Sequence, residues 1–121
     1  MMLENRPKTI FCDIDGTLIA HYGDGTKQHL RQPVILPGVS EKIKEWDRKG
    51  FYIILVTGRK ESTRKHTEEQ LAISGIVYDQ LIMGIGGGVR VLINDRKPDF
   101  PDDTAVAINL DRNIGFSDVN I

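Results

Sequence analysis

The sequence predicts an α/β fold in which one parallel β-sheet is covered by helices on both faces, three layers in all. Short apolar runs alternate along the 121 residues with two segments of helical period, which is the order of elements in such folds. The first two apolar runs also end directly in Asp and Thr side chains. Ligands of parallel sheets bind outside the carboxyl ends of the strands, so these endings favour a functional site there.

The first predicted strand lies within Lys8–Leu18, KTIFCDIDGTL, and ends at two carboxylates one residue apart. Asp13 and Asp15 point to the same side of the strand if the period of two persists. Two carboxylates this close repel each other unless a cation compensates, and Mg²⁺ favours a few carboxylates together with waters and phosphate. Gly16 permits the sharp turn that brings backbone N–H groups near an anion. The plain alternative is an acidic turn after a core strand.

A flap at about residues 19–37 follows, and it has no convincing helical period. We interpret it as a short hairpin that turns at Gly23-Asp24-Gly25 and returns through Val34-Ile35-Leu36. A long loop in a compact domain usually serves function. The flap is therefore expected to touch the substrate.

Two helices and a second strand come next. The first helix begins after Pro37-Gly38, presents one apolar face and ends at Gly50. The strand Phe51–Val56 is followed at once by Thr57, and a largely polar helix runs from about Lys60 to Ser74. Thr57 is expected to cap that helix, to bind an anion at its N-terminus, or to do both.

Three further apolar runs predict the remaining strands, at Gln80–Met83, Val89–Ile93 and Ala105–Leu110. We expect a Rossmann-like sheet of order 3-2-1-4-5, because this order gathers the ends of the first, second and fourth strands into one crevice. The glycine-rich loop Gly84–Gly88 does not match a dinucleotide-binding or phosphate-loop pattern. The last residues, 111–121, are expected to form a loosely held tail.

Three of the strand ends carry recognisable motifs: DIDGTL, ILVTGR and an apolar strand that ends in Asn94-Asp95. In this order they resemble the haloacid dehalogenase superfamily of aspartate-dependent phosphohydrolases, and the resemblance covers the chain from Lys8 to Leu110. It implies that Asp13 is the nucleophile and that Asp15 is the general acid and then the base. Thr57 would hydrogen-bond the transferring phosphoryl group.

The same resemblance implies a Mg²⁺ site. Asp13, the backbone carbonyl of Asp15 and Asp95 would bind the metal, and Asn94 would support it by hydrogen bonding. The alternative for Asn94-Asp95 is a polar turn of the segment Asn-Asp-Arg-Lys-Pro, which Pro98 ends.

Phosphate binding is likewise implied by the resemblance. The expected residues are Gly16, Thr57, Gly58, Arg59 and Lys97. Arg59 is included for its position after Thr57, where it could reach a phosphate or a substrate carboxylate; the alternative is an exposed Arg at the start of the helix. The superfamily also places a Lys or Arg near the glycine-rich loop to hold the nucleophile and the phosphate. No Lys stands in that loop, so we favour Arg90 for this catalytic role, with Lys97 second.

On this resemblance the chain is expected to be a Mg²⁺-dependent phosphatase that hydrolyses a phosphate monoester through an aspartyl-phosphate. The flap leaves no room for a cap domain, and capless members tend to act on large substrates or to form oligomers, so we keep a homo-oligomer open. Small capless members resemble phosphatases of sugar or polysaccharide synthesis, which favours a phosphorylated sugar as substrate.

Two other classes of function compete with the phosphatase. The first is a non-catalytic or regulatory binding module that kept the fold, and its support is the missing Lys. The second is a receiver domain, which also binds Mg²⁺ and is phosphorylated on Asp. A receiver domain carries its phosphoacceptor Asp after a later strand, whereas the second long strand here ends in Thr57.

Composition sets further limits. The chain is expected to form one domain, residues 1–121, and its formal net charge of −1 gives no basic field for nucleic acid. Cys12, the one cysteine, is expected to be a buried small hydrophobe, which fits a reducing compartment. The start, MMLENRPK, lacks the apolar region of a signal peptide, and no run approaches membrane-spanning length. We therefore expect a cytoplasmic protein without a membrane partner.

Overall fold

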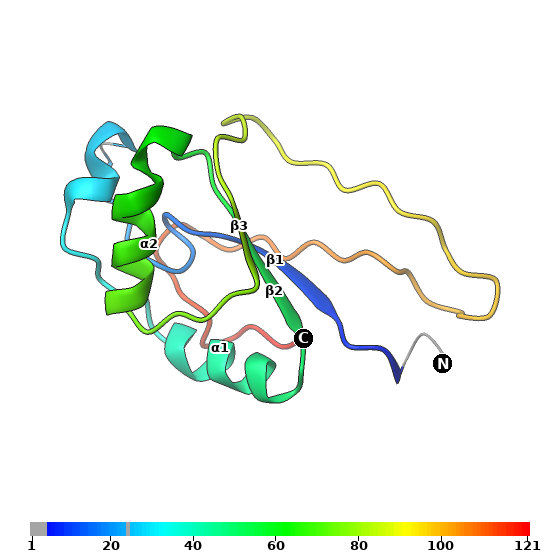
Figure 1. Cartoon of the computed structure of the whole chain (residues 1–121). Helices are drawn as coiled ribbons and strands as arrows, with labels where there is room; N and C mark the ends of the chain where they lie inside the picture. Colours follow the sequence, from blue (N-terminus) through cyan, green and yellow to red (C-terminus); the bar gives the residue numbers. More distant parts are fainter. Residues whose placement is uncertain (1–4, 24) are drawn as a thin grey trace.

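Three parallel strands form the sheet in the order β1-β2-β3 (Figure 1). They are β1 (Thr9–Asp13), β2 (Tyr52–Val56) and β3 (Gln80–Ile82). The structure is a computed structural model that describes residues 5–23 and 25–121. The turn predicted at Gly23-Asp24-Gly25 and the start of the chain therefore lie partly outside the described residues. The three strands are those predicted first, and their order is the 3-2-1 side of the expected sheet.

Four helical segments accompany these strands: η2 (Gly25–Leu30), α1 (Val39–Arg48), η3 (Glu61–Thr63) and α2 (Arg64–Ile73). The helix α1 follows Gly38, which has a positive φ, and the chain leaves it at Gly50, also with a positive φ, so both predicted ends are confirmed. Within the described ranges, none of these helices has the length and apolar character needed to cross a membrane.

The flap returns as predicted. Ile19 and Ile35 form an antiparallel bridge, and the backbone N–H of Ala20 donates to the carbonyl of Val34 at 2.9 Å. Between these two sides the flap contains η2, which was predicted as irregular chain. The flap is thus tied at its base and carries a short helical segment at its far end.

Helices cover one face of the sheet and leave the other exposed. Ile10 and Cys12 of β1 lie beside Ile53 and Leu55 of β2 on the covered face, and all four are buried. On the opposite face, Phe11, Tyr52 and Ile82 are 55%, 54% and 41% exposed. The prediction of helices on both faces is therefore wrong for the described chain. The physical reason is that the loop after β3 is too short to contain a third helix.

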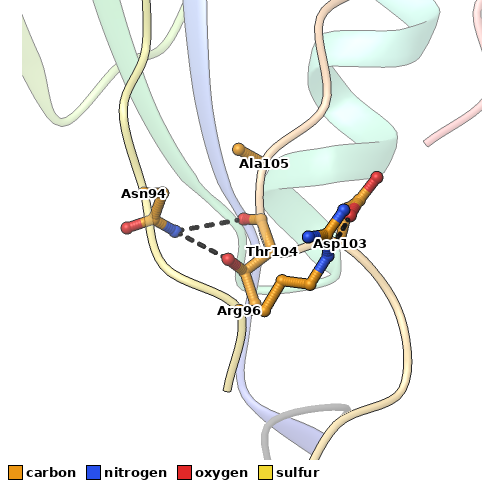
Figure 2. A pocket seen from close by; sticks show the side chains of 5 residues that line it. All are labelled: Asn94, Arg96, Asp103, Thr104 and Ala105. Carbon is orange, nitrogen blue, oxygen red and sulfur yellow. Dashed lines mark hydrogen bonds and ion pairs between the residues drawn. The ribbon is translucent and has the colours of Figure 1, made fainter. Parts of the chain in front are cut away.

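The strands predicted at Val89–Ile93 and Ala105–Leu110 also lie outside the sheet. They are the two legs of a long extended segment, residues 84–110, which we call the arm (yellow and orange in Figure 1). A strand parallel to its neighbour needs a crossover of roughly a dozen residues, and only the loop Gly84–Gly88 separates β3 from the first leg. Near the tip, the legs are joined by side chains: Asn94 donates to Thr104 at 3.0 Å and Arg96 pairs with Asp103 at 2.8 Å (Figure 2).

The tail, residues 111–121, is firmly packed, contrary to the prediction. Phe116 and Val119 are 3% and 5% exposed and belong to the hydrophobic core. The ring of Phe116 lies 5.5 Å from that of Trp46 on α1. The backbone N–H of Asn113 also donates to the carbonyl of Gly16 at 2.8 Å, which fixes the tail beside the end of β1. The sequence pattern of residues 111–121 could not predict this packing, because the contacts are made with residues far away in the chain.

Gly115 tests how tightly the tail is seated. It has a φ of +86°, and an added Cβ would overlap the backbone of Pro37. Gly50 has a similar φ of +75° but nothing within 4 Å of an added Cβ. We expect Gly50→Ala to lower the free energy of unfolding by roughly 1 kcal/mol through φ alone, and Gly115→Ala to lower it by about 1–3 kcal/mol more because of the overlap. Urea unfolding of both variants measures this, and equal losses would show that the tail yields freely.

Candidate active site

The end of β1 forms a tight turn that presents two carboxylates at the sheet edge. The backbone N–H of Leu18 donates to the carbonyl of Ile14 at 2.8 Å, and that of Gly16 donates to Ile19 at 2.7 Å. Gly16 has a φ of +84°, a conformation that favours glycine. As a result, the carboxylates of Asp13 and Asp15 form hydrogen bonds with different side chains.

Asp13 is the accessible carboxylate of the two. Its Oδ2 accepts a hydrogen bond from the Thr17 hydroxyl at 3.2 Å, and its Oδ1 accepts one from Nη1 of Arg90 at 3.0 Å. A third of its side chain is exposed. The structure thus brings Arg90 to Asp13, whereas Lys97 lies on the arm and pairs with Asp95.

Asp15 is held in a largely buried ion pair with Arg59. The guanidinium Nε and Nη2 of Arg59 donate to the two carboxylate oxygens at 2.8 and 2.7 Å. The Asp15 side chain is 16% exposed and the Arg59 side chain is 4% exposed. This bidentate geometry fixes both position and orientation of a carboxylate. Arg59 was predicted to bind phosphate, but here it binds Asp15.

Arg59 continues into a buried polar network that the sequence did not reveal. Its Nη1 donates to the hydroxyl of Thr67 at 3.0 Å and to Oε1 of Gln70. Gln70 in turn donates to the carbonyls of Arg31 and Gln28 in the flap, at 2.7 and 3.1 Å. Asp15 is therefore connected to the flap through α2. The one sequence signal was a polar residue on the inner face of a helix, which is costly unless it is hydrogen-bonded.

Thr57 is 2% exposed at the end of β2. Its hydroxyl accepts the backbone N–H of Arg59 at 3.1 Å, and its own backbone N–H donates to the carbonyl of Ile82 at 2.9 Å. The first helical residue after it is Glu61, so Thr57 does not cap a helix. Gly58 passes close to the glycine-rich loop after β3, because an added Cβ would lie 3.3 Å from the carbonyl oxygen of Ile85.

Comparison with known proteins identifies this arrangement. The family model described as haloacid dehalogenase-like hydrolase matches residues 10–89, which include both carboxylates, the end of β2 and β3. The chain belongs to the haloacid dehalogenase-like hydrolases. The match ends at the start of the arm, and a search of curated proteins gives no match.

Two solved structures resemble this hydrolase. A chain from "Structure of Pnkp1/Rnl/Hen1 complex" is 32% identical, with a TM-score of 0.59 over 72% of this chain and 31% of that one. A chain from "Structure of the Pnkp1/Rnl/Hen1 RNA repair complex" is also 32% identical, with a TM-score of 0.58 over 69% of this chain and 28% of that one. The hydrolase thus spans less than a third of either chain.

The residues expected to bind Mg²⁺ are not gathered in one place by this chain. Both carboxylate oxygens of Asp15 are bonded to Arg59. Asp95 lies on the arm, where hydrogen bonding and charge attraction from Lys97 lower its pKa, and Asn94 donates to Thr104. Over residues 5–23 and 25–121, no three His, Cys, Asp or Glu side chains are placed to hold a metal ion together. In the described part of a single chain, the residues expected to bind Mg²⁺ therefore do not form a metal site.

Cys12 directly precedes the candidate nucleophile Asp13, but its buried thiol is unreactive. Burial, together with the adjacent Asp13 charge, raises the pKa of its thiol to about 12. The thiolate is the reactive form of cysteine, so this side chain packs as a small apolar group, as predicted from its place in the first strand.

The chemical state of Cys12 is directly testable. We expect the native thiol to react with iodoacetamide at pH 8 at least ~100-fold more slowly than the same thiol in urea, because burial both blocks access and suppresses the thiolate. Mass spectrometry of timed samples measures the modified fraction. Equal rates in the native and unfolded protein would contradict the burial described for β1.

Removal of Arg59 tests the buried ion pair. Arg59→Met leaves the Asp15 carboxylate buried without its cation, and we expect a loss of about 3–5 kcal/mol in the free energy of unfolding. Lys49→Met is the matched control, since its ion pair with Glu45 has side chains that are 48% and 41% exposed. That variant should lose less than ~1 kcal/mol. Urea unfolding compares the two, and similar losses would refute a special role for the Arg59 pair.

Proposed function

We propose that this hydrolase is a phosphatase that cleaves a phosphate monoester through an aspartyl-phosphate on Asp13. The observation that carries the proposal is that the two carboxylates at the end of β1 differ in exposure and in their ion-pair partners. One third of the Asp13 side chain is exposed and it lies beside a cation, Arg90, whereas Asp15 is oriented by a buried guanidinium. One carboxylate is thus open to an incoming phosphorus atom, and the other is held at a fixed position beside it.

Each residue then has a defined part in the two half-reactions. An oxygen of Asp13 attacks phosphorus and the bond to the leaving oxygen breaks. Asp15 donates a proton to that oxygen, which requires that one of its two oxygens leaves Arg59 and is protonated before the step. In the second half, Asp15 takes a proton from water as the water oxygen attacks phosphorus. Inorganic phosphate leaves and Asp13 regains its free carboxylate. Arg90 balances the negative charge of the phosphoryl group, since its guanidinium already lies 3.0 Å from Asp13.

Mg²⁺ remains part of the proposal as the cofactor, with Asp13, Asp15, Asp95 and Asn94 as its residues. When bound, the metal would offset the charge on the phosphoryl oxygens. One described chain does not bring these residues together, and the two half-reactions above use only the side chains of Asp13, Asp15 and Arg90.

A phosphorylated sugar is our preferred substrate class, by analogy with small capless members of the superfamily. The flap is tied to Asp15 through Gln70 and Arg59, so the position of the flap is linked to that of this carboxylate. The likeness to a chain of an RNA repair complex supports a second candidate, a phosphomonoester at an RNA end. The net charge of −1 favours the small molecule over the polyanion.

The nucleophile is tested by release of inorganic phosphate from p-nitrophenyl phosphate, with and without Mg²⁺. We expect Asp13→Asn to abolish turnover while leaving the fold intact, because the amide cannot form the covalent intermediate. Asp47→Asn, on the exposed side of α1, is the matched control and should retain full turnover.

A panel of sugar phosphates and a phosphorylated oligoribonucleotide then separates the two substrate classes. Turnover that survives Asp13→Asn would exclude the mechanism. If the wild-type protein cleaves no ester in the panel, the non-catalytic binding module becomes the better description.

A further inference from the structure

The arm exposes more apolar surface than a soluble chain normally leaves to water. The exposed fractions are 95% for Val89, 79% for Val91, 90% for Ile93 and 78% for Val106. A contiguous apolar surface of this kind marks an interaction site. Its extended backbone also offers unpaired hydrogen-bonding groups to another strand.

The same molecule carries a matching receptor for such a strand. In the described ranges, β1 pairs with β2 on one side and with no strand on the other. Along this outer edge runs a groove of about 830 Å³. Its walls are residues 6–11, the tail residues Asn120 and Ile121, and the arm residues from Leu92 to Ile108. An added strand would therefore meet both a β-sheet edge and apolar walls.

The first leg of the arm cannot fill the place beside its own β1 as a parallel strand, whereas the second leg runs in the same direction as β1 and forms one wall of the groove (Figure 1). The first leg starts at the active site, where Arg90 contacts Asp13 at the carboxyl end of β1. From there it runs toward the amino-terminal end of β1, so the two segments are antiparallel (Figure 1). The loop Gly84–Gly88 is too short to carry the leg back to the other end of the sheet. Asp95, further along this leg, therefore lies away from its own Asp13 and pairs with Lys97.

A second copy related by a two-fold axis removes this conflict. Such an axis, perpendicular to β1, places the two β1 strands antiparallel. Each leg, antiparallel to its own β1, is then parallel to the β1 of the other copy. The lengths are compatible: at ~3.3 Å per residue, the five steps from Arg90 to Asp95 span about 17 Å and the four steps from Thr9 to Asp13 span about 13 Å, so the leg is long enough to run the whole length of β1. A leg that starts at one active site thus ends at the other.

We propose that two copies of this chain exchange arms, so that Val89–Ile93 of each copy becomes the fourth strand beside β1 of the other. The exchange brings Asp95 of one copy to Asp13 and Asp15 of the second, and so completes in trans the acidic site that one chain leaves incomplete. The apolar leg is covered and the outer edge of β1 is paired. The part of this proposal that concerns catalysis rests on the phosphatase function proposed above.

Assembly is measured first, independently of catalysis. We expect the wild-type protein to have twice the 13.6 kDa mass of the chain by sedimentation or native mass spectrometry. Val91→Asp should convert it to the monomer, because a charge would be buried at the sheet edge. The matched control is Ile73→Asp on α2, where the native side chain is 72% exposed and distant from the groove. This variant should remain a dimer.

Complementation then tests the shared site. Asp13→Asn and Asp95→Asn should each be inactive alone. In a dimer that holds one chain of each kind, the site with the intact Asp13 receives the intact Asp95 from the other chain. Co-refolding at an equal ratio should therefore restore about a quarter of wild-type phosphate release, since half of the dimers are mixed and each has one complete site of two.

Several results would overturn the proposal. They are a monomeric wild-type protein, a dimer that survives Val91→Asp, an active Asp95→Asn protein, and mixed dimers that recover no activity although wild type is active. A wild-type dimer that hydrolyses no ester would reject the phosphatase function alone. The exchange of arms would then be supported by a monomeric Val91→Asp variant and contradicted by a dimeric one.

Discussion

The pair between Asp15 and Arg59 is the interaction on which the arrangement of the active site depends. It joins the turn after β1 to the end of β2, and through Gln70 it reaches α2 and the flap. A buried charge pair is stabilising only when its remaining hydrogen-bonding groups are satisfied. Thr67 and Gln70 meet that condition for Arg59. The flap is thereby part of the same hydrogen-bonded unit as a catalytic carboxylate.

A second constraint is the length of the loop between β3 and the first leg of the arm. The five residues Gly84–Gly88 allow neither a crossover helix nor a parallel strand in the same chain. The uncovered face of the sheet, the unpaired edge of β1 and the extended arm all follow from it. The separation of Asp95 from Asp13 has the same origin, so one short loop determines which parts of the site a single chain can supply.

Local patterns were enough to predict much of the fold and some of the site. The apolar runs before Asp13 and before Thr57 are strands, as predicted. They could be recognised from composition and from the turn residues that follow them, both of which are local features of the sequence. Gly38 and Gly50 bound α1 for reasons of backbone conformation. Arg90 was expected near Asp13 on resemblance alone, and the structure brings the two side chains into contact.

The rest depended on distances that a sequence pattern does not contain. Val89–Ile93 has the composition of a strand, but whether it pairs depends on the reach of the preceding loop. Arg59 was expected to face a phosphate, a substrate carboxylate or solvent, whereas it bonds Asp15 and also Gln70, eleven residues further along on α2. The packing of Phe116 was missed because its partner, Trp46, lies on the first helix.

The position of Phe116 has a consequence for how the protein folds. The core around Trp46 is closed by the tail, and the side chain of Asn113 bonds the backbone of His21 across a separation of 92 residues. Contacts between such distant parts of a chain raise the contact order, which slows folding because the loop must close before the contacts form. The hydrophobic core around Trp46 therefore includes Phe116 and Val119, and its completion depends on closing a long stretch of chain.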